Sequence, residues 1–333
     1  MKNFTVRSPT RRLMRLAIFF TPWILGVTMG DCLAQIYPAR PVRIIVPSTP
    51  GSGIDTVART VAQKFSDAWG QQFIVDNRPG AGGNLAAGAV AKAAPDGYTW
   101  LISSSSLAIA PALFRQLPFD ALKDLAPTSQ IIATSHSLAV HPSMPNSLKD
   151  LVALAKSQPG KLNYGHAGTA TASHLLGEML RFATDADIVI IPYKGDAQAV
   201  PAILANEVAM GFVPPTNVIS LVRAGKLKVL AMSGNTRNPA FPDAPTTTEA
   251  GFPEVQYVGW VSLFAPAGTP RELQYKLATE VGRIMKMPDI IEQLPRLGGD
   301  AAGTMPEEFS ARFRSDVARY SRIIERAKIP SMD

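Results

Sequence analysis

The segment Val42–Phe65 constrains this chain most, because it joins a buried strand to a helix through a Pro/Gly/Ser turn. The β-branched run Val42–Val46 predicts the strand, and apolar residues at helical spacing follow the turn. Ser52 and Asp55 have the spacing of a capping box, so we expect the helix to begin close to Gly53. Such a turn leaves backbone N–H groups pointing at one spot, which suits an anion.

The same strand–turn–helix device recurs at Asn163–Glu178 and Tyr193–Leu204, and the repetition indicates a function. Elsewhere, short apolar runs alternate with helical patterns, which predicts an α/β fold with mostly parallel sheets. In open sheets of this kind, ligands bind at the carboxyl ends of the strands, where the Gly-rich turns lie. Near the end of the chain, Thr269–Glu272 combines a capping box with proline at the first helical position, so a helix should begin there.

Residues 1–34 have the order of an export signal. Five basic residues precede a short apolar core, and Cys32-Leu33-Ala34 places small residues at the −3 and −1 positions. We therefore expect cleavage after Ala34 and a periplasmic mature protein that starts near Gln35. The adjacent Arg11 and Arg12 suit either general secretion or the twin-arginine route, and this choice stays open.

Loss of this signal changes what the composition implies. The signal carries five basic residues and one acidic residue, so the formal net charge falls from +7 to about +3. We therefore expect no nucleic-acid partner. The single cysteine, Cys32, leaves with the signal, which excludes disulfides, zinc thiolate sites and cysteine nucleophiles from the mature chain. No cofactor and no metal site are expected.

Six segments of the chain, in order, resemble those of a known family. They are IIVPSTPGSGIDTVAR, DNRPGAGGNLAAGAVAKAAPDGYT, LNYGHAGTATASHLLGE, IPYKGDAQAV, VRAGKLKVLAMSG and LFAPAGTP. This order is similar to that of the Bug receptors, the periplasmic solute-binding proteins of tripartite tricarboxylate transporters. The resemblance runs from about Tyr37 to the C-terminus.

The resemblance implies a two-lobed periplasmic binding protein, or Venus flytrap. Lobe one would comprise residues 35–136 and 260–333, and lobe two residues 137–259. The chain would cross between the lobes near Ser135–Leu138 and Val258–Ser262. A small organic carboxylate would bind in the cleft, held by backbone amides, hydroxyls and waters. The expected partners are this ligand and the membrane permease subunits of the transporter, and the receptor would be a monomer.

The predicted ligand-binding residues come from the Gly-, Ser- and Thr-rich turns and from the family pattern. They are Ser48, Thr49, Gly51, Ser52, Gly53, Asp55, Ala81, Gly82, Ser104, Ser105, His166, Gly168, Thr169, Thr171, Lys194 and Val213.

Each of these positions also has an ordinary structural explanation. Glycines and serines make turns, and Thr171 is a natural N-cap for the helix that follows it. Asp55 suits a capping carboxylate better than a general base. His166 stands where the family usually has serine, and Val213 where aspartate often follows the phenylalanine, so the pocket would be less polar than in relatives. Whether His166 faces the cleft or packs outside it stays open.

Two other functions compete with transport. The chain has four histidines, but it lacks the nucleophile elbow, the Walker loop and the H-E-x-x-H helix, and we predict that it is not an enzyme; a hydrolase is the alternative. A receptor that signals to a membrane sensor kinase would need the same cleft and the same closure. The sequence does not separate transport from sensing.

Overall fold

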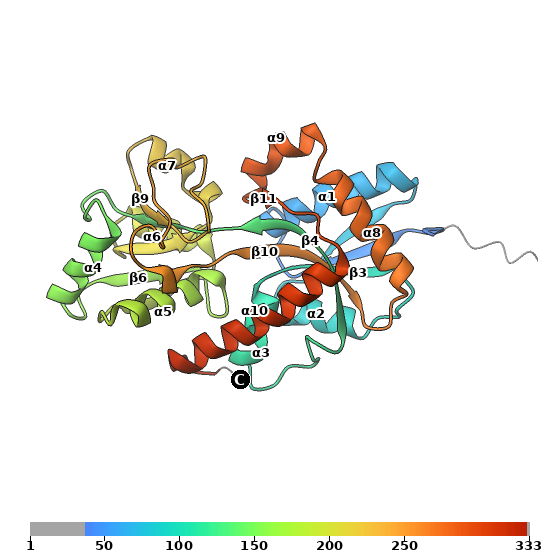
Figure 1. The fold of residues 1–333 in the computed structure, drawn as a ribbon, viewed down its shortest axis with the longest axis horizontal. Coiled ribbons are helices and arrows are strands. Elements are labelled where there is room, and N and C mark those ends of the chain that lie inside the picture. The colour runs from blue at the N-terminus through green and yellow to red at the C-terminus, as the bar shows by residue number, and fades with distance from the viewer. Residues whose placement is uncertain (1–36, 332–333) are drawn as a thin grey trace, which may run out of the picture. The chain divides into compact units, whose positions relative to one another are not determined.

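The computed structural model describes residues 37–331, and the predicted export signal lies outside them. It contains two β-sheets, each covered by helices (Figure 1). The six-stranded sheet has the order β11-β4-β10-β3-β1-β2, and the five-stranded sheet has the order β7-β6-β8-β5-β9. We call each sheet with its helices a lobe, lobe one for the larger sheet and lobe two for the smaller.

Lobe one contains both ends of the described chain. Its strands are β1 (Val42–Val46), β2 (Phe73–Asn77), β3 (Thr99–Ser104), β4 (Leu125–Thr134), β10 (Gly259–Pro266) and β11 (Asp300–Ala301). Its helices are α1 (Gly53–Trp69), η1 (Ala81–Gly83), α2 (Asn84–Ala91), α3 (Ser106–Leu113), α8 (Arg271–Ile284), α9 (Pro288–Leu297) and α10 (Pro306–Arg326).

Lobe two is built from the middle of the chain. Its strands are β5 (Ser137–Val140), β6 (Asn163–His166), β7 (Val189–Pro192), β8 (Met210–Val213) and β9 (Lys228–Met232). Its helices are α4 (Leu148–Ser157), α5 (Ala172–Thr184), α6 (Asp196–Leu204), η2 (Pro215–Asn217) and α7 (Ile219–Arg223), and η3 (Pro253–Val255) precedes the return to lobe one.

Both sheets are mixed. The parallel pairing expected from the sequence is present in β1–β2, β1–β3, β6–β7 and β6–β8. The strands that lead between the lobes pair antiparallel instead: β10 with β3 and β4, and β5 with β8 and β9. β4 ends at Thr134 and β5 begins at Ser137, so the chain leaves one sheet and enters the other within two residues. Figure 1 shows β4 and β10 running side by side toward lobe two.

Helix starts follow the sequence in two cases and depart from it in one. Ser52 caps α1 and Thr171 caps α5, as their positions predict. The capping box expected at Thr269 is wrong. The Thr269 hydroxyl donates to the Pro266 carbonyl at 2.8 Å, and α8 begins at Arg271 without a side-chain cap. Pro270 and not Thr269 occupies the N-cap position of α8, so the Thr269 hydroxyl lies one residue too early to cap the helix.

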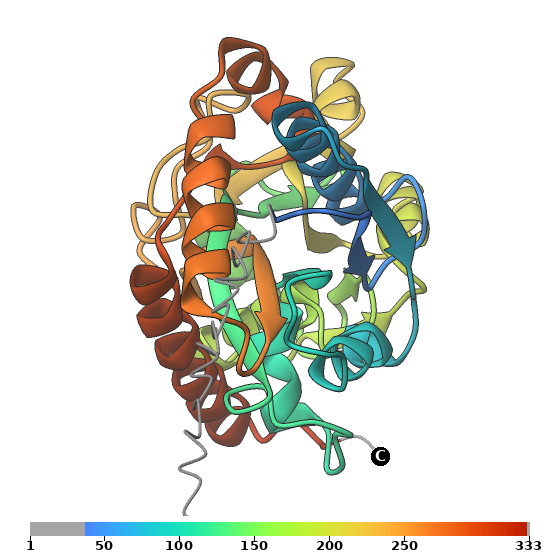
Figure 2. The ribbon, with the colours of Figure 1, turned by 90° about the vertical axis from the view of Figure 1, so that its right-hand side faces the viewer.

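An aromatic cluster fastens the C-terminal helix to the crossing strand β10. Trp260 and Phe264 of β10 pack against Phe309 and Phe313 of α10 with ring centroids 5.2–5.9 Å apart. The Trp260 indole N–H donates to the Asp316 carboxylate at 3.0 Å, so its one polar atom is satisfied. Figure 2 shows α8 and α10 lying together on one side of β4 and β10.

No helix among residues 37–331 is both long enough and apolar enough to cross a lipid bilayer.

Truncation of a side chain in the aromatic cluster between β10 and α10 should destabilise the protein. Phe309 is fully buried, so we expect Phe309→Ala to lower the free energy of unfolding by about 3–5 kcal/mol through lost burial and a residual cavity. Phe182→Ala is the matched control, because Phe182 is 48% exposed, and it should cost about 1 kcal/mol or less. Urea unfolding of both variants measures this. Equal losses for the two would contradict the assignment of Phe309 to the core.

Candidate functional site

A cavity of about 290 Å³ is lined by residues of both lobes. The first lobe contributes the turns before α1 and α3, and the second contributes the turns before α5 and α6. Thr134, Ser135 and His136, in the crossing between β4 and β5, border it as well. Every one of these segments is a strand end or a helix start, as expected for ligand sites in α/β sheets.

The N-terminus of α1 faces this cavity. Ser52 has extended backbone angles, and its hydroxyl accepts from the Asp55 amide at 3.3 Å. The amides of the first two helical residues, Gly53 and Ile54, have no acceptor within a helix. Both residues line the cavity. The cap therefore leaves two N–H groups available to a ligand.

The N-terminus of α5 repeats this arrangement from the other lobe. Thr171 is extended, and its hydroxyl accepts from the His174 amide at 3.3 Å. The same hydroxyl donates to the Gly168 carbonyl at 2.6 Å, which fixes the preceding loop. Ala172 and Ser173, the first two helical residues, line the cavity. Two positive helix ends thus meet at one cavity, which favours an anion.

Asp55 holds the first of these turns in place. Its carboxylate is 2% exposed and accepts from the Gly51 amide at 2.8 Å, Arg59 Nε at 2.9 Å and Asn77 Nδ2 at 2.8 Å. Burial alone would raise its pKa, but the hydrogen bonds from Arg59, Gly51 and Asn77 outweigh burial, so the pKa of Asp55 lies below its usual value. With these acceptor sites used, Asp55 positions the turn.

His166 lies beside His174 and not among the residues that line the cavity. The two rings stack with centroids 4.5 Å apart, and His166 Nδ1 lies 3.0 Å from the Gly168 carbonyl oxygen. Burial lowers the pKa of His166, with opposing effects from the Gly168 hydrogen bond and from Glu178. The ring supports the loop that leads into Thr171, and a direct contact between His166 and a ligand stays a prediction.

The other predicted residues fall into two groups. Those that line the cavity are Ser48, Ser52, Gly53, Ser104, Ser105 and Thr171. Those that do not line it are Thr49, Gly51, Asp55, Ala81, Gly82, His166, Gly168, Thr169, Lys194 and Val213.

Several residues of the second group have clear structural positions. Lys194 is exposed, and its amide donates to the Gln198 side chain. Val213 is buried in β8, where its carbonyl accepts from Ser137. Gly82 and Ala81 lie in η1 with positive φ angles of 63° and 48°. Ligand binding by these residues stays a prediction.

Three residues that border the cavity, His136, Asp196 and Tyr257, have side chains that no sequence pattern singled out for binding. Asp196 directly follows the turn of the third strand–turn–helix device, so the segment carried a signal although the side chain did not. His136 lies in the crossing, where no periodicity shows which way a residue points. Tyr257 precedes β10 and resembles any other core aromatic in the sequence.

These three residues set the charge of the cavity. Burial lowers the pKa of His136 to about 4, and burial raises the pKa of Tyr257 to about 12, so both are neutral at pH 7. Burial also raises the pKa of Asp196 from 3.8 to about 6, against a hydrogen bond from Asn217. At pH 7 Asp196 is therefore the one charged group among the lining side chains that the structure describes.

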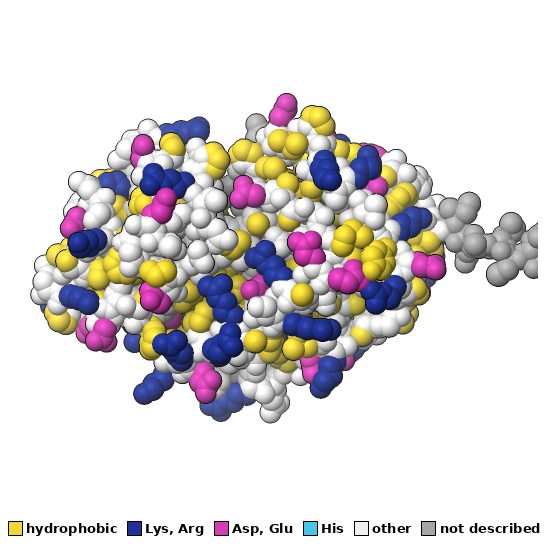
Figure 3. Space-filling view, viewed as in Figure 1, with side chains coloured by type: hydrophobic (Ala, Val, Ile, Leu, Met, Phe, Trp, Pro, Cys, Tyr) yellow, Lys and Arg dark blue, Asp and Glu magenta, His cyan; other side chains and the backbone are white. Residues whose placement is uncertain are grey.

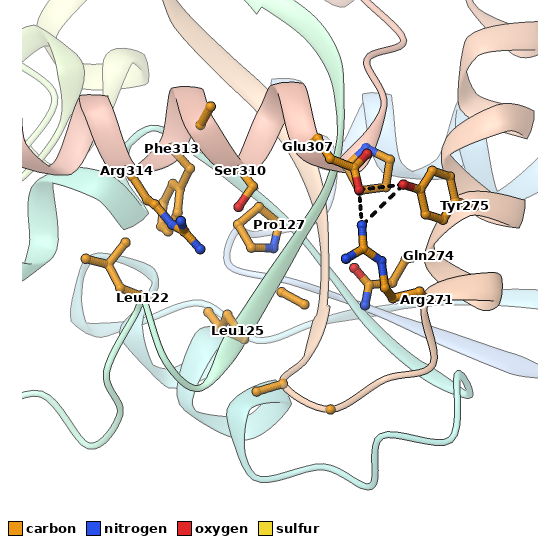
Figure 4. A pocket seen from close by; sticks show the side chains of 15 residues that line it. Leu122, Leu125, Pro127, Arg271, Gln274, Tyr275, Glu307, Ser310, Phe313 and Arg314 are labelled. Carbon is orange, nitrogen blue, oxygen red and sulfur yellow. Dashed lines mark hydrogen bonds and ion pairs between the residues drawn. The ribbon is translucent and has the colours of Figure 1, made fainter.

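A larger hollow of about 480 Å³ lies within lobe one, between α8, α10 and the start of β4. Figure 4 shows Arg271, Tyr275 and Glu307 turned toward one another there. The Tyr275 hydroxyl and the Arg271 guanidinium both donate to the Glu307 carboxylate. These polar groups satisfy one another, so this hollow offers a ligand less than the cavity between the lobes does.

The basic residues of the surface lie elsewhere. Figure 3 shows Lys and Arg side chains gathered where α10 runs, and that helix carries Arg312, Arg314, Arg319, Arg322 and Arg326. None of these five lines the cavity between the lobes. An anion in that cavity would therefore meet helix ends and hydroxyls and none of these arginines. Within residues 37–331, no cluster of three or more His, Cys, Asp or Glu side chains is placed to hold a metal ion.

A sequence profile described as "Tripartite tricarboxylate transporter family receptor" matches residues 57–329. The chain belongs to this family. It is 33% identical to protein BugT of Bordetella pertussis over 318 residues, which are 95% of this chain and 97% of BugT. This match confirms the resemblance to the Bug receptors, and the chain is a solute-binding receptor of that family.

Solved structures of the family share the fold. The R. palustris protein Rpa4515 with adipate is 30% identical, with a TM-score of 0.81 over 89% of this chain and 100% of that one. MatC from Rhodopseudomonas palustris with bound malate is 30% identical, with a TM-score of 0.77 over 86% and 100% of the two chains. The two-lobed binding-protein fold is thereby confirmed.

The buried Asp196 carboxylate should cost stability. Its folded pKa of about 6 exceeds 3.8, so the folded state takes up a proton before the unfolded state as pH falls. Asp196→Asn should therefore raise the free energy of unfolding by about 1–3 kcal/mol at pH 7.5, and the gain should shrink between pH 7 and pH 4. Chemical unfolding across this range measures the difference.

The control is Asp150→Asn, because Asp150 is an exposed first-turn aspartate that accepts a hydrogen bond from Ser147. That variant should lose a few tenths of a kcal/mol, since it weakens a capping interaction and relieves no burial. A loss of stability in Asp196→Asn at pH 7.5 would show that the carboxylate is well solvated or paired.

Proposed function

We propose that this receptor captures a small organic carboxylate in the cavity between its lobes. The observation that carries the proposal is the meeting of two capped helix N-termini, of α1 and α5, at one cavity. Each offers two free amides, and their partial positive charges add at a carboxylate placed between them. Hydroxyls such as those of Ser104 and Ser105 line the same cavity and supply further hydrogen bonds.

The relatives support this ligand class. Rpa4515 was solved with adipate and MatC with malate, and both are small carboxylates. A cavity of about 290 Å³ lies at the lower limit of ligand sites, which span about 300–1,000 Å³, and so suits a small molecule.

Binding would also stabilise a closed arrangement of the lobes. A ligand that touches both α1 and α5 favours the state in which these helices approach each other. Lobe one would then comprise residues 35–136 and 260–333, lobe two residues 137–259, with the hinge at Ser135–Leu138 and Val258–Ser262. A monomer in this state would deliver its ligand to the permease subunits of a tripartite tricarboxylate transporter.

Removal of one helix-end amide should weaken binding. Gly53→Pro deletes the first N–H of α1, while Ser52 already has the extended angles that proline requires before it (φ −72°, ψ 163°). Loss of a hydrogen bond to a charged group costs about 1.5–3 kcal/mol, so Kd for the best carboxylate of a thermal-shift screen should rise about 10- to 100-fold. Calorimetry measures this change.

Gly53→Ala is the matched control, because a Cβ at this position meets no atom within 4 Å. It keeps the N–H, and its Kd should stay within about threefold of the wild-type value, which corresponds to about 0.7 kcal/mol. Equal affinities of Gly53→Pro and Gly53→Ala would show that the Gly53 amide of α1 does not bind the ligand. Equal affinities for an acid and its neutral amide would contradict the proposal that a carboxylate anchors the ligand.

We also propose export to the periplasm with cleavage after Ala34, which the signal-like order of residues 1–34 supports. The soluble protein from the periplasmic fraction should then begin near Gln35. N-terminal sequencing or intact-mass measurement checks this. A soluble protein that keeps Met1 to Ala34 would contradict it.

A further inference from the structure

The cavity is lined by the carboxylate of Asp196, which a site that binds only anions would not need. Asp196 is the first residue of α6 and lines the cavity. The carboxylate receives a hydrogen bond from Asn217, but its Oδ1 atom is buried and has no hydrogen-bond partner within the described part of the chain. No ion pair of the described residues includes it. Buried polar atoms are almost always satisfied, so this one calls for a donor.

A capping role does not account for this carboxylate. An acidic residue in the first turn of a helix already stabilises the positive end of the dipole from an exposed position, without the desolvation that raises the pKa of Asp196. The next two residues of α6, Ala197 and Gln198, are exposed and would have placed an acid in solvent. A capping carboxylate also accepts from first-turn amides, whereas Oδ1 accepts none. Helix stability alone would therefore not favour burial at Asp196.

A second unsatisfied atom borders the same cavity. His136 Nδ1 is buried without a partner in the described chain, and His136 lines the cavity together with Asp196. Because the ring is neutral, this nitrogen either donates or accepts, according to its tautomer. Two incomplete hydrogen-bonding groups at one cavity indicate that the ligand completes both.

The charge balance of the cavity favours a ligand with a positive group. A dicarboxylate would place its second carboxylate in a space that already holds Asp196 and, among the described lining side chains, no cation. An ammonium placed there gives Asp196 an opposite charge and a donor, while the carboxylate of the same molecule occupies the helix ends.

We propose that Asp196 pairs with an ammonium group of the ligand, so that this receptor selects amino-carboxylates over the same acids without the amine. The proposal rests on the proposed function, since the carboxylate of the ligand is anchored at α1 and α5. Asp196 is then a specificity-determining residue, and the helix ends are the general carboxylate anchor.

Pairs of acids that differ by one amine test this assignment. Calorimetry at pH 8, where Asp196 is ionised, compares L-alanine with propanoate, 4-aminobutanoate with butanoate, and L-glutamate with glutarate. In the pair that binds best, the wild type should bind the amine-bearing acid at least tenfold tighter than the amine-free acid. Asp196→Asn should raise the Kd of that amine-bearing acid at least tenfold. The Kd of its amine-free partner should stay within threefold of the wild-type value or fall below it.

Asp196→Glu keeps the charge and should retain part of the preference for the amine, which separates loss of charge from disturbed packing. Unfolding curves of both variants establish that they are folded. An amine-free acid that binds as tightly as its amine-bearing partner, or an Asp196→Asn variant that weakens both equally, overturns the role of Asp196 and leaves the carboxylate anchor standing. Failure of every acid to bind the wild type overturns the proposed function and this inference together.

Discussion

A helix N-terminus has more N–H donors than its own chain can satisfy, and the proposed carboxylate site depends on how few of them are capped. Ser52 and Thr171 each use a hydroxyl on the third helical amide and leave the first two free. Full capping would stabilise each helix but remove the binding capacity. The network around Asp55 and the Thr171–Gly168 hydrogen bond then keep each uncapped end in place.

The proposed closure has a second requirement, that the two helix ends can approach each other while each keeps its own structure. β4 and β10 meet it, because they pair with each other over their length within the six-stranded sheet and lead directly into the crossings. The aromatic cluster of Trp260 and α10 fixes β10 at the lobe-one side. In the proposed closure, motion would be confined to the short segments beyond the paired strands, of which Ser135–His136 is only two residues long.

Much of this arrangement follows from local sequence rules. The starts of α1 and α5 were predictable because a hydroxyl residue, its capped amide and the apolar stripe all lie within a few residues. Thr269 shows the limit, since the same local pattern gives no cap when the helix begins one residue later, with Pro270 at the N-cap position. His166 and Asp196 were not predictable in the same way, because hydrophobic periodicity does not show whether a residue at a strand end or a helix start faces the cavity or a neighbouring ring.

Asp196 shows how a binding site departs from what stability favours. Desolvation raises its pKa, so the folded protein carries an unfavourable charge when the cavity holds no ligand. A ligand with a positive group relieves this cost, and the relief is larger when closure excludes more water. A carboxylate with one unsatisfied oxygen therefore couples binding to closure more strongly than a neutral side chain would. The same carboxylate opposes closure around a dicarboxylate, so specificity and conformational change come from one residue.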